Sequence, residues 1–335
     1  MRKLKNNKEI NVLIENTTYS LLVYLLVKKE WKKSIFVLNN ETVDVKILRK
    51  LNKYELYIYK NFIIKKNFLK YFKEYFKLYK YLYKINLLNN IIFYGNDNLD
   101  YFIFFRNKII LLEDGLLNYQ LKKITLKSII KNILLLRPLF FKSYGCSKYV
   151  KKIYLTGLAP IPEEIKDKVE IINLKELWSK KTEEEKKEIL DIFGFDENII
   201  NKIKNKKNIL FTQPLSEDRF ISEEEKIELY RKIIFNYSKK DLVIKTHPRE
   251  KTSYKKYFPE IEILNQSFPA ELFDLLDIKF ETAITIFSTA ALNFSKNSKI
   301  DFYGTKVHSN LLKQWGDSEK IMKANKFLNG EPINE

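Results

Sequence analysis

The chain contains little cysteine, histidine or glycine. Cys146 is its one cysteine and cannot form an internal disulfide, and no group of Cys and His residues has the spacing of a zinc site. The sequence therefore excludes a disulfide scaffold and a structural zinc ion, and it suits the reducing cytoplasm. Uninterrupted apolar runs of about 18 residues are also missing, so no membrane-spanning helix is predicted.

Several nucleotide-binding and catalytic motifs are absent. No Gly-x-Gly-x-x-Gly, Walker phosphate loop or Gly-x-Ser-x-Gly elbow occurs, which weakens the case for dinucleotide redox chemistry, P-loop ATP hydrolysis and esterase activity. No Asp-x-Asp occurs either, so a transferase that holds a metal ion with that motif is disfavoured. We therefore expect neither a cofactor nor a metal ion.

Positive charge is what the chain has in excess. With 61 Lys+Arg and 42 Asp+Glu the formal net charge is +19, while the hydrophobic fraction of 45% is typical of a folded protein. An AT-rich genome would favour the abundant Lys, Ile and Asn, so the charge has an explanation without function. A basic surface nevertheless attracts anionic partners, which include nucleic acid, lipid headgroups and phosphate-bearing substrates.

Short apolar runs alternate with helical segments, a pattern typical of parallel sheets covered by helices. The predicted strands are Asn11–Ile14, Ser34–Leu38, Leu56–Tyr59, Ile91–Tyr94, Lys108–Leu112, Asn208–Thr212, Leu242–Lys245, Glu262–Leu264, Ala283–Phe287 and Lys299–Tyr303. The charge-rich segment 161–207 is interpreted as exposed helices. The sequence predicts an α/β protein with two Rossmann-like domains, residues 1–155 and 156–335, that face each other across a central cleft.

The strand predicted over residues 108–112 stops at Glu113, Asp114 and Gly115. In open parallel sheets, ligands bind beyond the carboxyl ends of the strands. Carboxylates at that position can act as a general base or bind sugar hydroxyls, and the glycine permits a turn in which the backbone approaches a ligand closely. A solvated Glu-Asp-Gly turn is the simpler alternative.

A second group of polar residues follows the strand that ends in Lys245. His247, Pro248 and Arg249 come directly after it, and the proline biases the backbone of His247 toward an extended conformation. A fixed imidazole beside two cations can donate a hydrogen bond or a proton to a phosphate leaving group. A turn histidine that bonds only to backbone is the alternative.

A third group follows the strand predicted over residues 283–287. Ser288 and Thr289 enter a predicted helix, Thr289–Ser295, whose free N–H groups and dipole would form an anion site. Ordinary helix capping explains the same hydroxyl pair.

Two further pieces lie in the same half of the chain. The loop after residue 212 presents Gln213 and Asp218, and the segment that begins at Pro269 places Glu271 in the first turn of a short helix. Glu271 can accept hydrogen bonds from both ribose hydroxyls of a nucleotide, or it can simply complement the helix dipole.

The acidic pair before Gly115, His247-Pro248 and Ser288-Thr289, in this order, resemble the motifs of the bacterial sialyltransferases. The stretch TQPLSED at residues 212–218 and the Pro-Ala-Glu at residues 269–271 make the chain most similar to glycosyltransferase family 52, the lipooligosaccharide sialyltransferase family. The resemblance covers nearly the whole chain, loosely in its first 90 residues.

This resemblance implies a GT-B fold, CMP-sialic acid as the donor substrate, inversion at the anomeric carbon and no metal. It makes residues 1–155 the acceptor-side domain and residues 156–335 the nucleotide-sugar-binding domain. The acceptor would be a terminal galactose of a surface glycan or glycolipid, such as lipooligosaccharide or capsule. These roles are expectations that the resemblance adds to the residues described above.

The resemblance also implies individual roles. His247 would assist departure of the CMP phosphate, Ser288 and Thr289 would bind that phosphate, and Glu271 would hold the ribose. The general base would be Asp218, which shares a domain with the donor site, or else Asp114 or Glu113 of the acidic motif. The other residues expected on the donor side are Gly115, Gln213, Lys245, Pro248 and Pro269.

Three alternative functions remain open, and one of them is a family member that transfers another sugar. Transferases of the CDP-glycerol type also combine a GT-B fold with His-Pro and hydroxyl motifs, and they would replace sugar transfer by phosphoryl transfer. A basic nucleic-acid-binding protein is the non-enzyme alternative, although no recognised nucleic-acid motif occurs, and we expect no nucleic-acid partner. A homodimer is compatible with the sequence, which does not determine the oligomeric state.

The segment from Lys66 to Lys84 predicts an amphipathic helix. Its lysines share one face at about 3.6 residues per turn, and an aromatic and aliphatic stripe lies opposite. The plain interpretation is a core-packed helix with lysines in water. The functional one directs the lysines toward an anionic membrane and places a cytoplasmic protein peripherally on the inner face of the cytoplasmic membrane.

Overall fold

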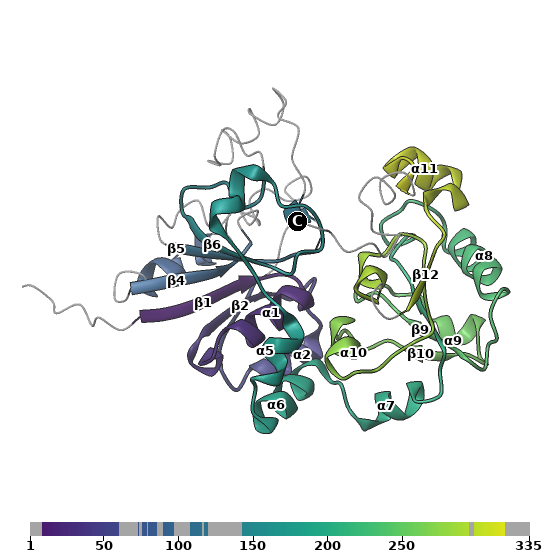
Figure 1. The fold of residues 1–335 in the computed structure, drawn as a ribbon, viewed down its shortest axis with the longest axis horizontal. Coiled ribbons are helices and arrows are strands. Elements are labelled where there is room, and N and C mark those ends of the chain that lie inside the picture. The colour runs from purple at the N-terminus through teal and green to yellow at the C-terminus, as the bar shows by residue number, and fades with distance from the viewer. Residues whose placement is uncertain are drawn as a thin grey trace, which may run out of the picture. The chain divides into compact units, whose positions relative to one another are not determined.

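The computed structural model describes residues 9–59, 73, 76–78, 80–85, 90–96, 108–115, 117–119, 143–294 and 298–318 (Figure 1). The chain divides into two compact units, Met1–Ile192 and Phe193–Glu335. Each unit contains one sheet, and every strand pair described in it is parallel.

The sheet of the first unit has seven strands in the order β3-β2-β1-β4-β5-β6-β7. Their bounds are β1 Glu9–Glu15, β2 Ile35–Asn39, β3 Glu55–Tyr59, β4 Asn90–Gly95, β5 Lys108–Leu112, β6 Val150–Leu155 and β7 Val169–Ile171. From β1 the chain continues to β2 and β3 on one side, and β4 then lies on the other side of β1. The order therefore reverses between β1 and β4, where the loops that leave the two strands diverge.

Helices cover this sheet and explain its continuous apolar strands. The helices of the first unit are α1 Thr18–Val27, α2 Val45–Leu51, α5 Leu174–Ser179 and α6 Glu183–Phe193, the last of which ends at the unit boundary. All five residues of β2 are buried, as expected for a strand with both faces covered. Helix α1 begins at the cap Thr17, whose side chain accepts a hydrogen bond from Ser20 N, and it contacts α5 (Figure 1).

Residues 156–192 belong to the first unit, whereas the sequence analysis assigned them to the second domain. The reason is strand pairing, because β7 extends the first sheet beside β6. The segment 161–207 also contains this strand besides helices, and α7 spans Glu197–Ile203. Glu188 of α6 forms ion pairs with Lys32 and Lys53, which adds contacts within the same unit.

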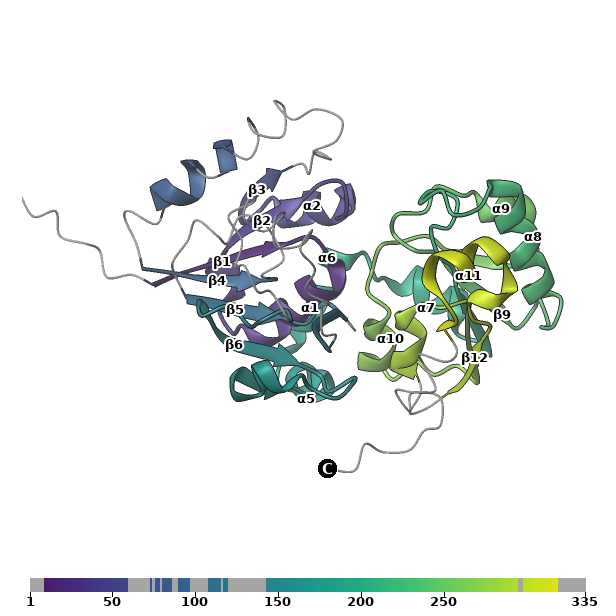
Figure 2. The same cartoon turned by 90° about the horizontal axis from the view of Figure 1, so that it is seen from above.

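The predicted lysine-faced helix lies only partly within the described residues. Residues 76–78 and 80–85 are helical and lie beside β3, where the rings of Tyr57 and Tyr81 stack 4.5 Å apart (Figure 2). Leu78 and Leu82 are buried in the core of the first unit, while Lys77 is exposed. Lys73, Lys80 and Lys84 are exposed too. The remaining residues of this prediction, Lys66 to Phe72 among them, lie outside the described residues.

The sheet of the second unit has five strands in the order β10-β9-β8-β11-β12. Their bounds are β8 Asn208–Phe211, β9 Leu242–Lys245, β10 Glu262–Leu264, β11 Thr282–Thr285 and β12 Lys299–Phe302, and the α-helices are α8 Glu223–Ile234, α9 Tyr254–Tyr257, α10 Glu271–Leu275 and α11 Ser309–Trp315. The strand order reverses between β8 and β11. This reversal is the ligand-binding position of an open parallel sheet.

Different side chains cover the two faces of this sheet. Ile227, Tyr230 and Ile233 of α8 pack on one face with Tyr254 of α9 and Leu311 of α11, and α8 and α9 lie on the same side of the strands (Figure 2). Phenylalanines form the core of the opposite face through ring contacts at 4.9–6.2 Å, and they are Phe195, Phe211, Phe268, Phe273, Phe280 and Phe294.

One predicted helix differs from the helix observed. The helix predicted over Thr289–Ser295 is a 3-10 helix, η5 Thr289–Phe294. A 3-10 segment of six residues has a weak dipole. It therefore supports anion binding at Ser288 and Thr289 less strongly than the predicted α-helix would. Among the described residues, no helix is long and apolar enough to cross a membrane.

Candidate active site

Gln213 joins the two strands at which the second sheet reverses. It comes just after β8, and its backbone N–H donates to Tyr230 Oη at 2.8 Å. Its side-chain Oε1 accepts from the backbone N–H of Phe287, beyond β11, at 3.0 Å. Gln213 thus fixes the loop that presents Ser288, whose own N–H donates to Thr285 Oγ1 at 2.8 Å.

His247 lies beyond the end of β9 in a half-buried position. Its Nδ1 accepts a hydrogen bond from the backbone N–H of Arg249 at 3.1 Å, so the ring proton of the neutral imidazole resides on Nε2. Burial, then the charges of Arg249 and Lys245, lower the pKa of His247 to about 4. Above that pH the imidazole is neutral and offers an Nε2–H donor.

Asp218 and Arg249 form a bidentate ion pair close enough to His247 for both charges to act on its imidazole. The Arg249 Nη1 donates to Asp218 Oδ1 at 2.6 Å, and Nη2 donates to Oδ2 at 3.0 Å. The pair is half exposed, with 29% of the Asp218 side chain accessible. Asp218 therefore lies near the histidine, as its predicted role requires, but both of its oxygens accept from Arg249.

A buried lysine, Lys226 of α8, holds the two loops of this site together. Its Nζ lies 2.8 Å from Glu217 Oε2 and 2.9 Å from Glu250 Oε1, and its side chain is fully buried. Glu217 directly precedes Asp218. Glu250 Oε2 accepts from the backbone N–H of His247 at 2.7 Å. One cation on α8 thus anchors both loops. Lys226 was not among the site residues predicted from the sequence.

The carboxylate of Glu217 is strongly held by this cluster. Burial acts to raise its pKa, but hydrogen bonds from Lys226 Nζ and from the backbone N–H of Lys251 outweigh burial and lower the pKa to about 2. The cluster therefore contains a cation and a firmly ionised carboxylate beneath the loops.

Lys245 is buried and bonds to backbone rather than facing solvent. Its Nζ donates to the carbonyls of Thr246 at 3.0 Å and Gln266 at 2.8 Å, and lies 4.6 Å from the ring centre of Phe268. Burial lowers the pKa of Lys245 to about 8, and the charges of Glu250 and Glu271 oppose that shift. Lys245 thus links the histidine loop to the loop that leads to Glu271.

Glu271 begins α10, as predicted, and it follows Pro269 by two residues. Pro248 lies exposed in the turn after His247. Ser288 Oγ accepts from the backbone N–H of Ala290 at 3.3 Å, and Thr289 is the first residue of η5. The predicted site residues of the second unit therefore lie at the carboxyl ends of its strands or in the segments that follow.

Glu113 is the buried structural member of the acidic motif in the first unit. Its side chain is fully buried, and its carboxylate accepts from Tyr19 Oη at 3.2 Å, Tyr119 Oη at 3.1 Å and both the hydroxyl and the backbone N–H of Thr156. Burial raises the pKa of Glu113 to about 7. These bonds join the ends of β5 and β6 to α1, so the group suits positioning better than proton transfer.

Asp114 and Gly115 are partly accessible. Burial raises the pKa of Asp114, and a hydrogen bond from Thr17 acts against that shift. Gly115 has φ 65°, the left-handed region that glycine enters readily, so the chain turns here as expected. Glu15, the last residue of β1, is a fully buried acid that sequence reasoning did not single out.

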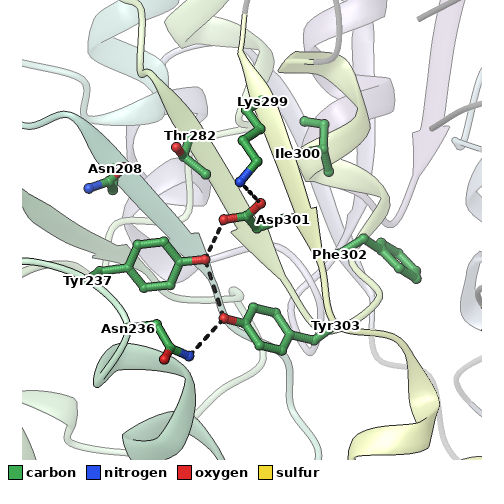
Figure 3. A pocket seen from close by; sticks show the side chains of 9 residues that line it. All are labelled: Asn208, Asn236, Tyr237, Thr282, Lys299, Ile300, Asp301, Phe302 and Tyr303. Carbon is green, nitrogen blue, oxygen red and sulfur yellow. Dashed lines mark hydrogen bonds and ion pairs between the residues drawn. The ribbon is translucent and has the colours of Figure 1, made fainter. Parts of the chain in front are cut away.

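A separate hollow of about 620 Å³ lies at the amino ends of β8 and β11 and along β12 (Figure 3). Its polar side chains bond to one another: Tyr237 Oη donates to Asp301 Oδ2 at 2.6 Å, and Lys299 Nζ lies 2.8 Å from Asp301 Oδ1. Because the hollow lies at the amino ends of β8 and β11, the two strands at which the sheet order reverses, we do not assign the donor to it.

Solved structures of known proteins share this fold. A sialyltransferase of Photobacterium damselae matches 96% of each chain at 14% identity with a TM-score of 0.59. The α/β-galactoside α-2,3-sialyltransferase of Photobacterium phosphoreum matches 97% of each chain at 15% identity with a TM-score of 0.60. A UDP-GlcNAc 2-epimerase of Neisseria meningitidis, at 12% identity, has a TM-score of 0.52 over 98% of this chain and 95% of the epimerase. The predicted GT-B fold is confirmed.

Sequence comparison defines the family. An uncharacterized protein of Haemophilus influenzae is 48% identical over 234 residues, which are 69% of this chain and 74% of that protein. The family model described as glycosyltransferase family 52 matches residues 32–311, a range that contains every predicted site residue. The protein is therefore a glycosyltransferase, and the chain belongs to glycosyltransferase family 52.

Proposed function

We propose that the protein transfers sialic acid from CMP-sialic acid to a terminal galactose of a surface glycan, lipooligosaccharide or capsule, with inversion and without a metal ion. The observation that carries this proposal is the neutral imidazole of His247 beyond the carboxyl end of β9, with Nε2–H available as a donor. Ser288 follows β11, one of the two strands between which the order of the second sheet reverses. Sialyltransferases among the solved proteins of this fold support the choice of sugar.

The reaction requires little from the protein beyond hydrogen bonds and a base. A bond forms between the acceptor oxygen and the anomeric carbon, and the bond from that carbon to the phosphate oxygen breaks. Its electron pair leaves with CMP, and the hydroxyl proton passes to a carboxylate. The Nε2–H of His247 stabilises the charge that develops on the phosphate and keeps its proton. A single phosphate needs fewer positive charges than a diphosphate.

Ser288 and Thr289 bind that phosphate in this proposal, and Glu271 accepts hydrogen bonds from the ribose hydroxyls. We expect the double variant Ser288→Ala, Thr289→Ala to weaken CMP binding about 10²–10⁴-fold, because two hydrogen bonds to a charged group are lost and each contributes about 1.5–3 kcal/mol. Isothermal titration calorimetry with CMP measures the change. Thr282→Ala, at the other end of β11, is the matched control. Unchanged affinity in the double variant would leave the two residues as ordinary caps.

The general base is Asp218 in this proposal, with Asp114 as the alternative. We expect Asp218→Asn to lower transfer to the acceptor by about 10²–10⁴-fold, since an amide cannot take the proton, while CMP still binds. Rates of transfer to lactose for Asp218→Asn, Asp114→Asn and Glu113→Gln identify the base.

The variant Arg249→Met distinguishes two roles of Asp218, proton transfer and ion pairing with Arg249. It breaks the ion pair but keeps the Asp218 carboxylate, so a base at Asp218 would retain much of its activity. Equal losses in Arg249→Met and Asp218→Asn would mean that Asp218 only holds Arg249. A nearly wild-type Asp218→Asn with an inactive Asp114→Asn would move the base to the first unit.

Incubation with CMP-sialic acid and lactose, followed by mass spectrometry, tests the proposed function directly. The expected product is sialyllactose together with CMP. A parallel incubation with CDP-glycerol tests the rival phosphoryl transfer. Turnover of CDP-glycerol alone would overturn the proposal.

A further inference from the structure

The hollow along β12 is built by two segments that are far apart in the sequence. β12 is the last strand in the order of the second sheet. Lys299 and Asp301 of this strand, and Tyr303 just after it, alternate along the chain and therefore point to one side of the sheet. Asn236 and Tyr237 come from the turn after α8, and Figure 3 shows that their side chains reach those of the strand.

A chain of hydrogen bonds holds these side chains in place. Lys299 Nζ lies 2.8 Å from Asp301 Oδ1, and Tyr237 Oη donates to Asp301 Oδ2 at 2.6 Å. Asn236 Nδ2 donates to Tyr303 Oη at 3.3 Å, and the two tyrosine oxygens are 3.4 Å apart. Both tyrosines also pack against the core that α8 forms with the sheet. A ligand would therefore meet side chains that are already ordered, which lowers the entropic cost of binding.

Several polar atoms of the hollow are available to a ligand. The side-chain amide of Asn208 and Oδ1 of Asn236 make no hydrogen bond within the described part of the chain. The carboxylate of Asp301 uses two of its four or so acceptor positions. The contact between the two tyrosine oxygens is long, so the hydroxyl proton of Tyr303 is available as well. The hollow thus offers donors and acceptors beside two aromatic rings.

The charge of the lining indicates the chemical class of the ligand. Among the described residues that line the hollow, Lys299 is the one cation and Asp301 the one carboxylate, and they pair with each other. A phosphate or another anion would therefore find no unpaired cation there. A neutral pyranose carries C–H groups across its ring and hydroxyls around it, which match tyrosine rings with amides and a carboxylate beside them. The volume of about 620 Å³ is also usual for a small-molecule site.

We propose that this hollow binds a neutral hexose unit of a glycan, as a second sugar site separate from the site at His247. The hollow lies at the amino ends of β8 and β11, whose four residues each span about 13 Å. One hexose cannot occupy both strand ends. The hollow holds a part of the acceptor glycan away from the reacting bond and thereby raises the effective concentration of the acceptor. The inference rests on membership of a glycosyltransferase family and not on the identity of the donor.

Chemical-shift mapping by NMR with neutral disaccharides locates the bound sugar. We expect lactose or maltose, added to ¹⁵N-labelled protein, to shift the amide resonances of residues 236–237 and 299–303 in a saturable way. CMP, which is an anion, should leave these resonances in place. Shifts from CMP but from neither disaccharide would overturn the proposal, and so would the absence of any shift at these residues with both sugars.

Substitutions show whether the hollow itself makes the contact. Tyr303→Ala removes a ring and a hydroxyl, so the dissociation constant for the disaccharide should rise about tenfold. Tyr303→Phe keeps the ring and its packing and should raise the constant about threefold, because one hydrogen bond is lost. Tyr257→Ala, at a half-buried tyrosine of α9 against the same core, is the matched control.

Circular dichroism establishes that each variant is folded, and Tyr303→Phe serves as the test if Tyr303→Ala is not. Affinities for the disaccharide that are the same in wild type and in both Tyr303 variants would overturn the proposal. Failure of the wild-type protein to use CMP-sialic acid would refute the proposed function alone, because the disaccharide titration contains no donor.

Discussion

Replacing His247 with alanine should lower turnover by about 10²–10³-fold, the usual effect of removing one positioned donor from a developing anion. The affinity for CMP should change much less, since the bond strengthens mainly as charge builds on the phosphate. Steady-state rates with CMP-sialic acid and lactose, combined with CMP calorimetry, measure both quantities.

His308→Ala is the matched control, because the chain has two histidines with the same local bond. His308 Nδ1 accepts from Asn310 N at 3.2 Å and caps α11, as His247 Nδ1 accepts from Arg249 N. The control should cost about 1 kcal/mol of stability as a lost cap and leave turnover intact. Comparable turnover losses in both variants would remove His247 from the mechanism.

Because His247 is neutral, a substitution can distinguish a hydrogen-bond donor from a general acid at this position. Glutamine keeps an N–H donor near the position of Nε2, so His247→Gln should recover part of the rate if the imidazole donates a hydrogen bond. A general acid would not be rescued in this way. With the pKa of His247 near 4, the imidazole stays neutral from about pH 5 to 8, so kcat/KM should show no inflection from this residue near pH 6.5.

Lys226→Met should destabilise the second unit by about 3–5 kcal/mol, the range found when one partner of a buried ion pair is removed. The variant leaves the carboxylates of Glu217 and Glu250 in the interior without their cation. Urea unfolding followed by circular dichroism measures the loss. Lys232→Met, an exposed position on the same helix, should stay within about 0.5 kcal/mol of wild type.

The sign of the pH dependence follows from Glu217. Because its pKa is lowered to about 2 in the folded protein, its stabilising contribution is complete above pH 4.5 and is lost as the pH falls toward 2. Lys226→Met should flatten this part of the stability profile. A loss below about 1 kcal/mol in Lys226→Met at neutral pH would contradict the buried ion-pair cluster.

Most strands were predictable because covered parallel strands are continuous apolar runs. The ten strands expected from sequence all occur, with ends that differ by at most two residues. β6 was missed because Lys151 and Lys152 interrupt its apolar pattern, and β7 because it lies in the charge-rich segment 161–207, which was interpreted as exposed helices. The predicted domain boundary differs from the observed one because of these two omissions. Pairing of β7 with β6 keeps residues 156–192 in the first unit.

The positions of Asp114, His247 and Ser288 beyond strand ends were predictable, because at each of them a polar motif follows an apolar strand. Lys226 was missed because the run EEEKIE reads as a solvated helix face. A signal did exist, since Lys226 precedes Tyr230 by one turn and shares the apolar face of α8 with Ile227 and Ile233. Glu15 gave a similar signal as an acid at the end of an apolar strand. Its position beside β4 depends on the strand order, which no local pattern contains.

The anchoring of two loops by Lys226 has a consequence for the cost of ligand binding. Loops that bind ligands usually open on their own, and a ligand must then supply the free energy that orders them. Here the backbone N–H groups of His247 and Lys251 donate to glutamates that the lysine of α8 holds. These loops therefore form one cooperative unit with α8, and a nucleotide bound there, as we propose, would meet them already ordered.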